Sequence, residues 1–346
     1  MELNKLTINI NSTVIDVLRK IDSLPSIQTV FVVDDNNKVV GTITDGDIRR
    51  GLINGLTTRS PLDSFIFRDF NYLETGKNNF DKIKVLRDKK LKAVPLLTKE
   101  GRLIKVINFT KVKSILPVDA VIMAGGIGAR LKPLTNNTPK PLLKIGGKEI
   151  ISYNFDRLLQ YGINQQYVAV NYLADQIIDY CENYDEDINF TIIKETNFLG
   201  TAGALSLIDD FLNDTILLMN SDILTNIDYE DFYKSFIEKD ADILVASVPY
   251  QVNLPYAIFD EKDNIVNSFK EKPSYTYYAN AGIYLIKKDL IDIIPENQVY
   301  NATDLMEDTI KSGKKVIHYP IRQYWLDIGK HDDFEKAQKD IAHINW

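Results

Sequence analysis

The chain of 346 residues is poor in the residue types that build disulfides, zinc sites and many acid–base sites. Its single cysteine, Cys181, excludes an internal disulfide and a cysteine-rich metal site. Only three histidines occur, at positions 318, 331 and 343, which argues against a catalytic site built on histidine. There is no run of eighteen apolar residues, and residues 1–4 lack the basic and apolar blocks of a signal peptide. These absences predict a cytoplasmic protein.

Positive charge is also in deficit. The chain has 41 Lys and Arg against 48 Asp and Glu, so its formal net charge is −7. This balance argues against general binding to nucleic acid or anionic membranes, although it permits a local basic pocket for phosphates. The chain is 45% hydrophobic, as in soluble globular proteins, and its length suits two domains, each with its own core.

The first 116 residues contain an internal repeat. Residues 29–43 (TVFVVDDNNKVVGTI) align without a gap with residues 93–107 (AVPLLTKEGRLIKVI). Each copy is predicted to form two strands around a polar turn, with a helix after them, over 47–53 and 111–116. An amphipathic helix is predicted before each pair of strands, near 14–21 and 80–87. We therefore predict a domain over 1–116, made of repeats at about 1–60 and 61–116.

Residues 41–48 (GTITDGDI) give this repeat a resemblance to the CBS-domain pair. In that family the Thr and Asp of G-x-x-T-x-x-D line a cleft for adenosine nucleotides, and here they match Thr44 and Asp47. The second copy has Asn108 and Lys111 instead, so the resemblance implies at most one intact regulatory site. The alternative is structural, because Thr and Asp are also good helix caps.

After Pro117 the pattern changes to apolar strands that alternate with amphipathic helices. Strands are predicted at 120–123, 166–170, 189–193 and 215–219, and helices near 152–160, 174–180, 204–212 and 333–341. This alternation predicts an α/β domain over 118–346, with a Rossmann-like, doubly wound and mainly parallel sheet. Ligands of such sheets bind beyond the carboxyl ends of the strands.

A glycine-rich loop follows the first of these strands, at residues 124–135 (AGGIGARLKPLT). Glycines let the backbone approach a phosphate chain and turn its N–H groups toward it. Arg130 adds a bidentate donor and Lys132 a mobile charge. The loop lacks the Gly-Lys-Ser/Thr of a P-loop, and Leu131 replaces the third glycine of a dinucleotide-binding motif. Taken alone, the glycines are equally typical of a tight turn.

The continuation TPKPLL at 138–143 makes the pattern specific. G-G-x-G-x-R-L-x-P-L-T followed by P-K-P resembles the sugar-1-phosphate nucleotidyltransferases, whose fold is related to that of GT-A glycosyltransferases. Ala129 departs from the family's Ser or Thr. The resemblance implies nucleotide binding by Ala124, Gly125, Gly126 and Gly128, and catalytic roles for Arg130 and Lys140.

Further segments match the family in its order along the chain. For LGTAGA at 199–204 the resemblance implies contacts of Gly200, Thr201 and Ala202 with the nucleoside. Asp222, in LLMNSD, and Asp327, in YWLDIG, match the family's two Mg²⁺ ligands, with Ser221 in place of the usual Gly. Sugar-phosphate binding is implied for four residues in FKEKP and NAGIY: Glu271, Lys272, Asn280 and Gly282. Without the family pattern, Asp222 would be interpreted as a turn residue, and the charged residues 270–272 (KEK) as a solvent-exposed turn.

The resemblance implies the reaction of a nucleoside triphosphate with a sugar 1-phosphate to give an NDP-sugar and pyrophosphate, with Mg²⁺ as cofactor. With a repeat module ahead of this domain, the chain is most similar to the GTP:glucosamine-1-phosphate guanylyltransferases of legionaminic acid biosynthesis, and then to mannose- and heptose-1-phosphate guanylyltransferases. The alternatives are a uridylyl- or thymidylyltransferase and, in another class, an inactive nucleotide sensor. A glycosyltransferase would need Asp-x-Asp where residues 220–222 read NSD. CBS pairs commonly associate in twos, so a homodimer is expected by analogy.

Overall fold

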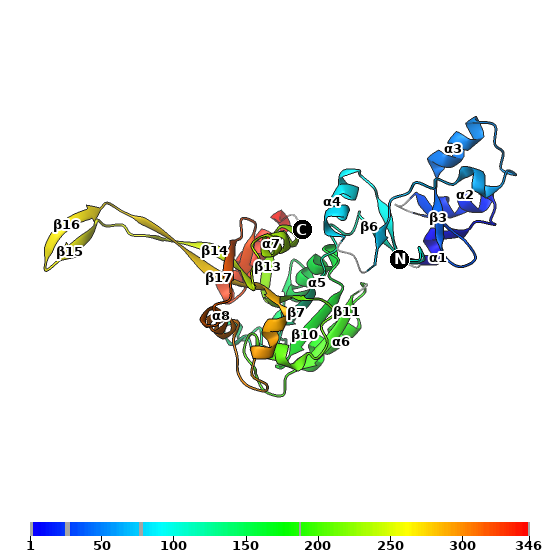
Figure 1. The fold of residues 1–346 in the computed structure, drawn as a ribbon. Coiled ribbons are helices and arrows are strands. Elements are labelled where there is room, and N and C mark those ends of the chain that lie inside the picture. Colours follow the sequence, from blue (N-terminus) through cyan, green and yellow to red (C-terminus); the bar gives the residue numbers. More distant parts are fainter. Residues whose placement is uncertain (1–2, 25–27, 76–78, 187, 345–346) are drawn as a thin grey trace. The chain divides into compact units, whose positions relative to one another are not determined.

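The computed structural model describes residues 3–24, 28–75, 79–186 and 188–344. The chain divides into two compact units, Met1–Ile115 and Leu116–Trp346. Figure 1 shows the fold coloured along the sequence. Within the described ranges, no helix combines the length and the apolar character needed to cross a membrane.

The N-terminal unit is built from two copies of one strand arrangement. Each copy is a three-stranded sheet in which the middle strand pairs parallel with the first strand and antiparallel with the third. The strands of the first copy are β1 (Thr7–Asn9), β2 (Thr29–Val33) and β3 (Val39–Thr44), and those of the second are β4 (Leu73–Glu74), β5 (Ala93–Leu97) and β6 (Leu103–Asn108). Both copies shift register at the matching place, Val32/Val33 and Leu96/Leu97.

The helices of this unit cover the sheets with short apolar stripes. They are α1 (Leu3–Leu6), α2 (Val14–Asp22), α3 (Asp45–Ile53) and α4 (Phe80–Asp88). In α2 the buried residues are Val14, Val17 and Ile21, which recur at helical spacing. The helix expected over 111–116 is not formed, because residues 109–111 make a turn. Asn108 Oδ1 accepts hydrogen bonds from the Thr110 backbone N–H and hydroxyl (2.9 and 2.7 Å), which favours that turn over a helix.

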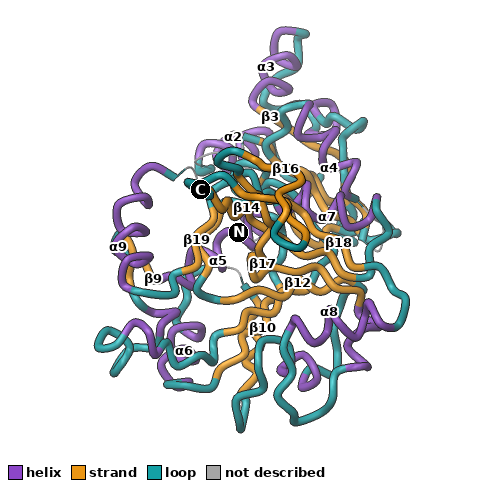
Figure 2. Tube along the Cα trace, turned by 90° about the vertical axis from the view of Figure 1, so that its left-hand side faces the viewer, coloured by secondary structure: helices purple, strands orange, loops and turns teal. Residues whose placement is uncertain are grey.

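The C-terminal unit is organised around a seven-stranded sheet in the order β11-β10-β7-β12-β17-β14-β18. Six strands run parallel to one another and β17 alone is antiparallel, so the prediction of a mainly parallel α/β sheet is confirmed. Their bounds are β7 (Asp119–Met123), β10 (Gln165–Val170), β11 (Asn189–Lys194), β12 (Thr215–Asn220), β14 (Ile243–Asn253), β17 (Ser274–Lys287) and β18 (Val316–Pro320). Figure 2 labels five strands of this sheet, β10, β12, β17, β14 and β18, and β7 lies between β10 and β12.

The order of the strands reverses direction at β7. From β7 the chain proceeds to β10 and β11 on one side, and returns to β12 on the other. The carboxyl ends of β7 and β12 therefore lie side by side, with Asn220 directly opposite Met123. A reversal of this kind leaves a crevice beyond the strand ends, where doubly wound sheets bind their ligands.

The helices of this unit are α5 (Ile150–Gln160), α6 (Ala174–Glu182), α7 (Tyr229–Glu238), α8 (Ala302–Lys311) and α9 (His331–Asp340). The helix expected near 204–212 is instead a 3₁₀ segment, Gly203–Leu207. Its start is held from outside, because the N–H groups of Ala202 and Gly203 both donate to the carbonyl of Tyr300 (3.0 and 2.9 Å). Two small sheets complete the unit: β8 (Lys144–Ile145) with β9 (Lys148–Glu149), and β13 (Ile223–Thr225) with β19 (Trp325–Asp327).

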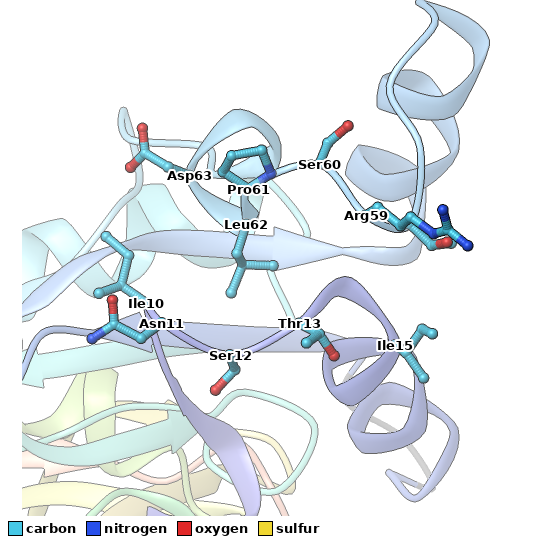
Figure 3. Close-up of a pocket in the computed structure, with 11 residues that line it drawn as sticks. Ile10, Asn11, Ser12, Thr13, Ile15, Arg59, Ser60, Pro61, Leu62 and Asp63 are labelled. Carbon is cyan, nitrogen blue, oxygen red and sulfur yellow. The ribbon is translucent and has the colours of Figure 1, made fainter.

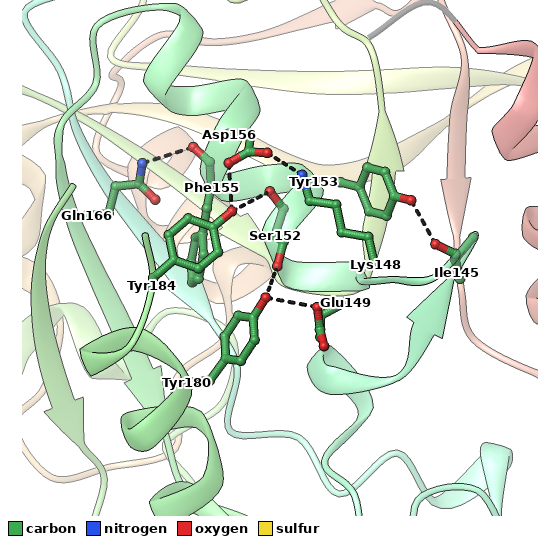
Figure 4. Close-up of polar contacts among 10 residues, drawn as sticks. All are labelled: Ile145, Lys148, Glu149, Ser152, Tyr153, Phe155, Asp156, Gln166, Tyr180 and Tyr184. Atoms are coloured by element: carbon green, nitrogen blue, oxygen red, sulfur yellow. Dashed lines mark hydrogen bonds and ion pairs between the residues drawn. The ribbon is translucent and has the colours of Figure 1, made fainter. Parts of the chain in front are cut away.

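Tyrosine hydroxyls connect α5 to its neighbours (Figure 4). Tyr180 of α6 bonds to Ser152 Oγ (2.6 Å) and donates to Glu149 Oε2 (2.9 Å). Tyr184, just beyond α6, donates to Asp156 Oδ1 (2.6 Å), and Lys148 pairs with the same carboxylate. These bonds fix the helix that follows the phosphate-loop region.

A two-stranded ribbon leaves the sheet at its β14–β17 pair. Both strands are buried within the sheet, over 243–247 and 281–286, but are mostly exposed further out. The chain continues into β15 (Ile258–Lys262) and β16 (Ile265–Lys270), in which every residue is exposed. The tip turns at Asp263 and Asn264, whose positive φ angles of 53° and 64° suit a tight hairpin. We call residues 247–280 the ribbon; Figure 1 shows it extending away from the sheet of its unit.

Candidate active site

In the glycine loop that follows β7, Gly128 is confined by its neighbours whereas Gly126 is not. Gly128 has a positive φ of 63°, and a Cβ there would lie 3.0 Å from Thr135 Cγ2 and 3.1 Å from Lys140 Cβ. Its carbonyl accepts a hydrogen bond from the Thr135 hydroxyl (2.9 Å), which closes the loop. The Ala124 N–H is already used, because it donates to the Ala169 carbonyl (2.8 Å). Gly126 is exposed and a side chain there would meet nothing within 4 Å.

The structure brings Asp222 and Asp327 together, although 105 positions (327 minus 222) separate them in the chain. Asp222 follows β12, and Asp327 ends β19, which pairs with β13 so that Ile223 lies opposite Asp327. The Ile328 N–H donates to the Asp222 carbonyl (3.1 Å) and fixes this register. The two carboxylates therefore lie at the same edge, beside the glycine loop.

Lys140 lies between these carboxylates. Its Nζ donates to Asp222 Oδ2 and is 4.0 Å from Asp327 Oδ1. Only 8% of Lys140 is exposed. A buried ammonium group is stable when paired in this way, so the lysine and the two carboxylates depend on one another.

Each aspartate has one buried oxygen that accepts no hydrogen bond within the described part of the chain, although Asp327 Oδ1 lies within ion-pair distance of Lys140. Oδ1 of Asp222 and Oδ1 of Asp327 are buried and have no hydrogen-bond partner among the residues that the structure describes. Burial raises the pKa of Asp327, the charge of Asp222 raises it further, and Lys140 and Arg130 oppose the shift. Two adjacent carboxylates with unsatisfied oxygens suit a hard divalent cation such as Mg²⁺, which takes few protein ligands when substrate phosphates supply the rest.

These two aspartates are the acidic part of the site. No group of three or more His, Cys, Asp or Glu side chains gathers in the described part of the chain in a way that could hold a metal. Arg130 lies beside Asp327 and Gly329; a Cβ on Gly329 would be 3.4 Å from its guanidinium. The structure thus gathers Arg130, Lys140, Asp222 and Asp327.

The LGTAG segment packs against the start of α8. A Cβ on Gly200 would lie 2.6 Å from the Tyr300 carbonyl oxygen, and Gly200 has a positive φ of 84°. The Thr201 hydroxyl accepts from the Ala302 N–H (2.9 Å), so it caps α8 rather than the segment that follows it. Ala202 is fully buried. These contacts give Gly200, Thr201 and Ala202 a structural role. Their contacts with the nucleoside stay a prediction.

The four residues expected to bind the sugar phosphate divide into two pairs. Asn280 and Gly282 lie at the base of the ribbon, where a Cβ on Gly282 would be 2.8 Å from Asn220 Nδ2. The Asn280 side chain accepts from the Gly282 N–H (2.9 Å) and donates to the Tyr284 hydroxyl (2.8 Å). Glu271 and Lys272 are exposed and lie beyond Ser274, where the β14–β17 ladder ends.

Sequence reasoning missed Glu195. This residue directly follows β11 and is only 4% exposed. Its Oε2 lies against the glycine loop, 2.6 Å from where a Cβ on Gly125 would be, and its Oε1 has no partner among the described residues. The available signal was its position, a carboxylate at the carboxyl end of a predicted strand and shortly before LGTAG.

In the N-terminal unit, Thr44 and Asp47 bond to each other as a capping box at the start of α3. The Thr44 N–H and hydroxyl donate to Asp47 Oδ2 (2.8 and 2.6 Å), and Asp47 Oδ1 pairs with Arg50 (2.6 Å). A separate cavity of about 670 Å³ in this unit is lined by residues 10–13, 15 and 58–63 (Figure 3). Thr44 and Asp47 are not among its lining residues.

Comparison with known proteins places both parts of the chain. Residues 1–54 match the CBS domain. The bifunctional protein GlmU of Methanocaldococcus jannaschii is 30% identical over 229 residues, which cover 64% of this chain and 54% of that protein. The mannose-1-phosphate guanyltransferase of Saccharomyces cerevisiae is 29% identical over 228 residues, covering 62% of each chain. The chain thus spans 54% to 62% of the length of these relatives.

Two solved structures share the fold of the C-terminal unit. A putative glucose-1-phosphate thymidylyltransferase from Bacillus anthracis gives a TM-score of 0.53 at 24% identity, over 66% of this chain and 97% of that one. HddC from Yersinia pseudotuberculosis gives 0.50 at 27% identity, over 64% and 99%. Residues 119–344, a range that contains the glycine loop and both aspartates, match the nucleotidyl transferase family, and the chain therefore belongs to that family.

Proposed function

We propose that the chain is a Mg²⁺-dependent nucleotidyltransferase that converts a nucleoside triphosphate and a sugar 1-phosphate to an NDP-sugar and pyrophosphate. The observation that carries this proposal is the meeting of Asp222, Asp327 and Lys140 beside the glycine loop, with an unsatisfied oxygen on each aspartate. The family match supports the same reaction class.

In this reaction an oxygen of the sugar phosphate attacks the α-phosphorus, and pyrophosphate leaves on the opposite side. The attacking phosphate is already an anion at neutral pH, so the site needs no general base. Two polyanions must instead be held close together, which is a task of positioning and charge neutralisation. Arg130 and the backbone N–H groups of the glycine loop bind the triphosphate, and Lys140 neutralises charge at the reacting phosphorus.

Asp222 and Asp327 would hold Mg²⁺ through their unused oxygens. When bound, the cation neutralises charge on the phosphates of both substrates. Lys140 keeps the two aspartates in place and limits the repulsion between them. Asn280 and Gly282 border the same edge, and we assign them, with Glu271 and Lys272, to the sugar phosphate.

We infer that the nucleotide is GTP. A carboxylate can accept hydrogen bonds from both the N1–H and the 2-amino group of guanine. Uracil and thymine offer a single N–H between two carbonyl oxygens, which a carboxylate would repel. Glu195, buried against Gly125 with an unpartnered oxygen, supports this choice, as does the name of the Saccharomyces cerevisiae relative. Uridylyl or thymidylyl transfer is the alternative.

For the sugar we propose glucosamine 1-phosphate, with mannose or heptose 1-phosphate as the nearest alternatives. The support is the similarity in domain order to glucosamine-1-phosphate guanylyltransferases. The relatives named after mannose 1-phosphate support the wider class of hexose 1-phosphates.

The test is a matrix of triphosphates against sugar 1-phosphates, with pyrophosphate release as the readout. We expect release with GTP and an amino- or neutral hexose 1-phosphate, and its loss when Mg²⁺ is chelated. Release with UTP or dTTP in place of GTP would support the alternative. Binding of nucleotide without any release, across the whole matrix, would indicate a sensor and contradict the proposed reaction.

A further inference from the structure

One face of the ribbon is largely apolar and partly to fully exposed in the part of the chain that the structure describes. Residues that face each other across the two strands, and every second residue along them, share a face. One face carries Val248, Tyr250, Val252, Tyr275, Tyr277 and Ala279. Tyr250 and Tyr277 lie opposite each other and are 63% and 60% exposed. A two-stranded ribbon is at best marginally stable alone in water, and an apolar patch of this kind marks an interface.

The opposite face of the ribbon is more polar. It carries Pro249, Gln251, Asn253, Ser274, Thr276 and Tyr278. The ribbon is therefore amphipathic, and its composition fits burial on one side only. If both faces of the ribbon were exposed to water, polar residues would be expected on both of them.

Lys272 cannot reach the carboxylates of its own chain in this arrangement. The strand pair changes register between Val245 and Ser247, opposite Gly282, whose φ is +70°. Beyond that point the ladder from Asn280 to Ser274 is unbroken. At roughly 3.3 Å per residue, the eight positions from Asn280 to Lys272 span about 26 Å, which a lysine side chain cannot bridge.

The site within one chain is short of positive charge. Arg130 and Lys140 are balanced by Asp222 and Asp327, and Lys140 is already paired with both aspartates. A bound divalent cation and the exposed Lys132 would then have to offset the charge of both a triphosphate and a sugar phosphate. Lys272, meanwhile, is an exposed cation with a positive φ of 43° before Pro273, a sparsely populated backbone conformation.

We propose that two copies of the chain exchange ribbons, so that Glu271 and Lys272 of each copy complete the sugar-phosphate subsite beside Asp222 and Asp327 of the other. This inference rests on the proposed function. A two-fold pair completes both sites at once, whereas any other protein on the apolar face would leave the charge deficit in place. On the receiving copy, Ile127 in the glycine loop and Phe198 before LGTAG are 54% and 53% exposed and offer apolar contact.

Complementation between two inactive chains tests the exchange. Lys272→Ala and Asp222→Ala chains, each with its own affinity tag, are coexpressed and purified through both tags. In a ribbon-exchanged pair one of the two sites has both residues intact, so turnover should recover to about half that of the wild type. Each variant purified alone should have lost most activity. No recovery in the doubly tagged sample, or full activity of Lys272→Ala alone, would overturn the proposal.

The matched control combines two changes in the same part of the site. Asp222→Ala and Asp327→Ala chains, coexpressed in the same way, give pairs in which each site lacks one carboxylate. We expect no recovery from this pair, because exchanged ribbons do not carry either aspartate. Recovery here would mean that the chains regain activity by another route, and would overturn the proposal.

The molecular mass of the protein in solution can be measured without any substrate. It therefore tests ribbon exchange separately from the proposed function. Light scattering should give two copies for the wild type and one for the Tyr250→Ser, Tyr277→Ser double variant. The matched control, Gln251→Ala with Thr276→Ala on the polar face, should keep two copies and its activity. A monomeric wild type would overturn the exchange even if the enzyme were active. Inactivity of a dimeric wild type would count against the proposed function alone.

Discussion

Asp222 shows how closely catalysis and stability are joined at a single residue. Replacing it by Ala removes one of the two carboxylates that we propose to hold Mg²⁺, and also leaves the buried Lys140 with its weaker partner at 4.0 Å. We expect pyrophosphate release to fall by roughly 10²–10³-fold or more, the scale for a preorganised electrostatic group. Steady-state rates at saturating substrates measure this. Asp209→Ala, at an exposed position in the same unit, is the control and should leave the rate unchanged. Wild-type turnover by Asp222→Ala would refute the metal assignment.

Glu195 gives a pH dependence of known sign. Burial raises the pKa of its carboxyl group, and a hydrogen bond from the Leu199 backbone opposes the shift only in part. The folded state therefore holds this proton more tightly than the unfolded state does. Its contribution to stability is fully present below the unfolded pKa of about 4.3 and is lost as pH rises through the folded pKa.

A Glu195→Gln variant removes this titration. Relative to the variant, the wild type should lose free energy of unfolding as pH rises across that window, and the difference should then level off. Urea unfolding at a series of pH values measures both curves. Curves that stay parallel from acid to neutral pH would show that Glu195 has no raised pKa. The same variant should lose preference for GTP if the carboxylate reads guanine.

At the scale of elements, Tyr184 tests how the polar cluster on α5 holds the site's supporting helix. Tyr184→Phe removes the bond to Asp156 and leaves that carboxylate to Lys148 alone. Loss of one such bond to a charged group should cost about 1.5–3 kcal/mol in the free energy of unfolding. Denaturant unfolding measures the change, with Tyr256→Phe, on an exposed side chain, as the control. Equal stability of the two variants would contradict a structural role for the cluster.

Elements that depend on the local sequence pattern were predicted correctly, whereas an element that depends on a distant contact was not. The strands expected at 120–123, 166–170, 189–193 and 215–219 correspond to β7, β10, β11 and β12. Runs of buried apolar residues define β7, β10 and β12, whereas β11 has no buried residue and is marked by its β-branched and aromatic side chains. The expected helix near 204–212 failed for a tertiary reason. The Tyr300 carbonyl takes the N–H groups of Ala202 and Gly203, and no local pattern records a contact made a hundred positions away.

The same limit applies to the candidate site. Motifs identified Arg130, Lys140, Asp222 and Asp327, and the fold gathers them through β12, β13 and β19. The pattern FKEKP could not show that Lys272 lies on a ribbon, because strands that leave a sheet and strands that stay in it have the same alternation. Glu195 escaped notice because one carboxylate after a strand is common, and only its burial against Gly125 distinguishes it.

At the scale of the whole molecule, the question is whether the repeat unit senses a nucleotide. The capping box uses Thr44 and Asp47, but it leaves one hydrogen-bond acceptor position of Asp47 unoccupied. A carboxylate offers about four acceptor positions, and Asp47 uses three of these on Thr44 and Arg50, which leaves one for a ribose hydroxyl. We therefore expect AMP or ATP to bind the unit and to change the kinetics of the best substrate pair.

Asp47→Asn separates ligand binding from helix capping. Asp47 is the third residue of the capping box, and Asn there keeps one oxygen that accepts from the Thr44 N–H and hydroxyl, so the box should survive, whereas the response to AMP should weaken or vanish with the charge. Calorimetric titration of AMP and pyrophosphate release, measured on both proteins, give the two readouts. Unchanged kinetics and no binding in the wild type would leave the capping box as the whole role of these residues. A response that survives in Asp47→Asn would place the nucleotide elsewhere, with the cavity at residues 10–13, 15 and 58–63 as the next site to test.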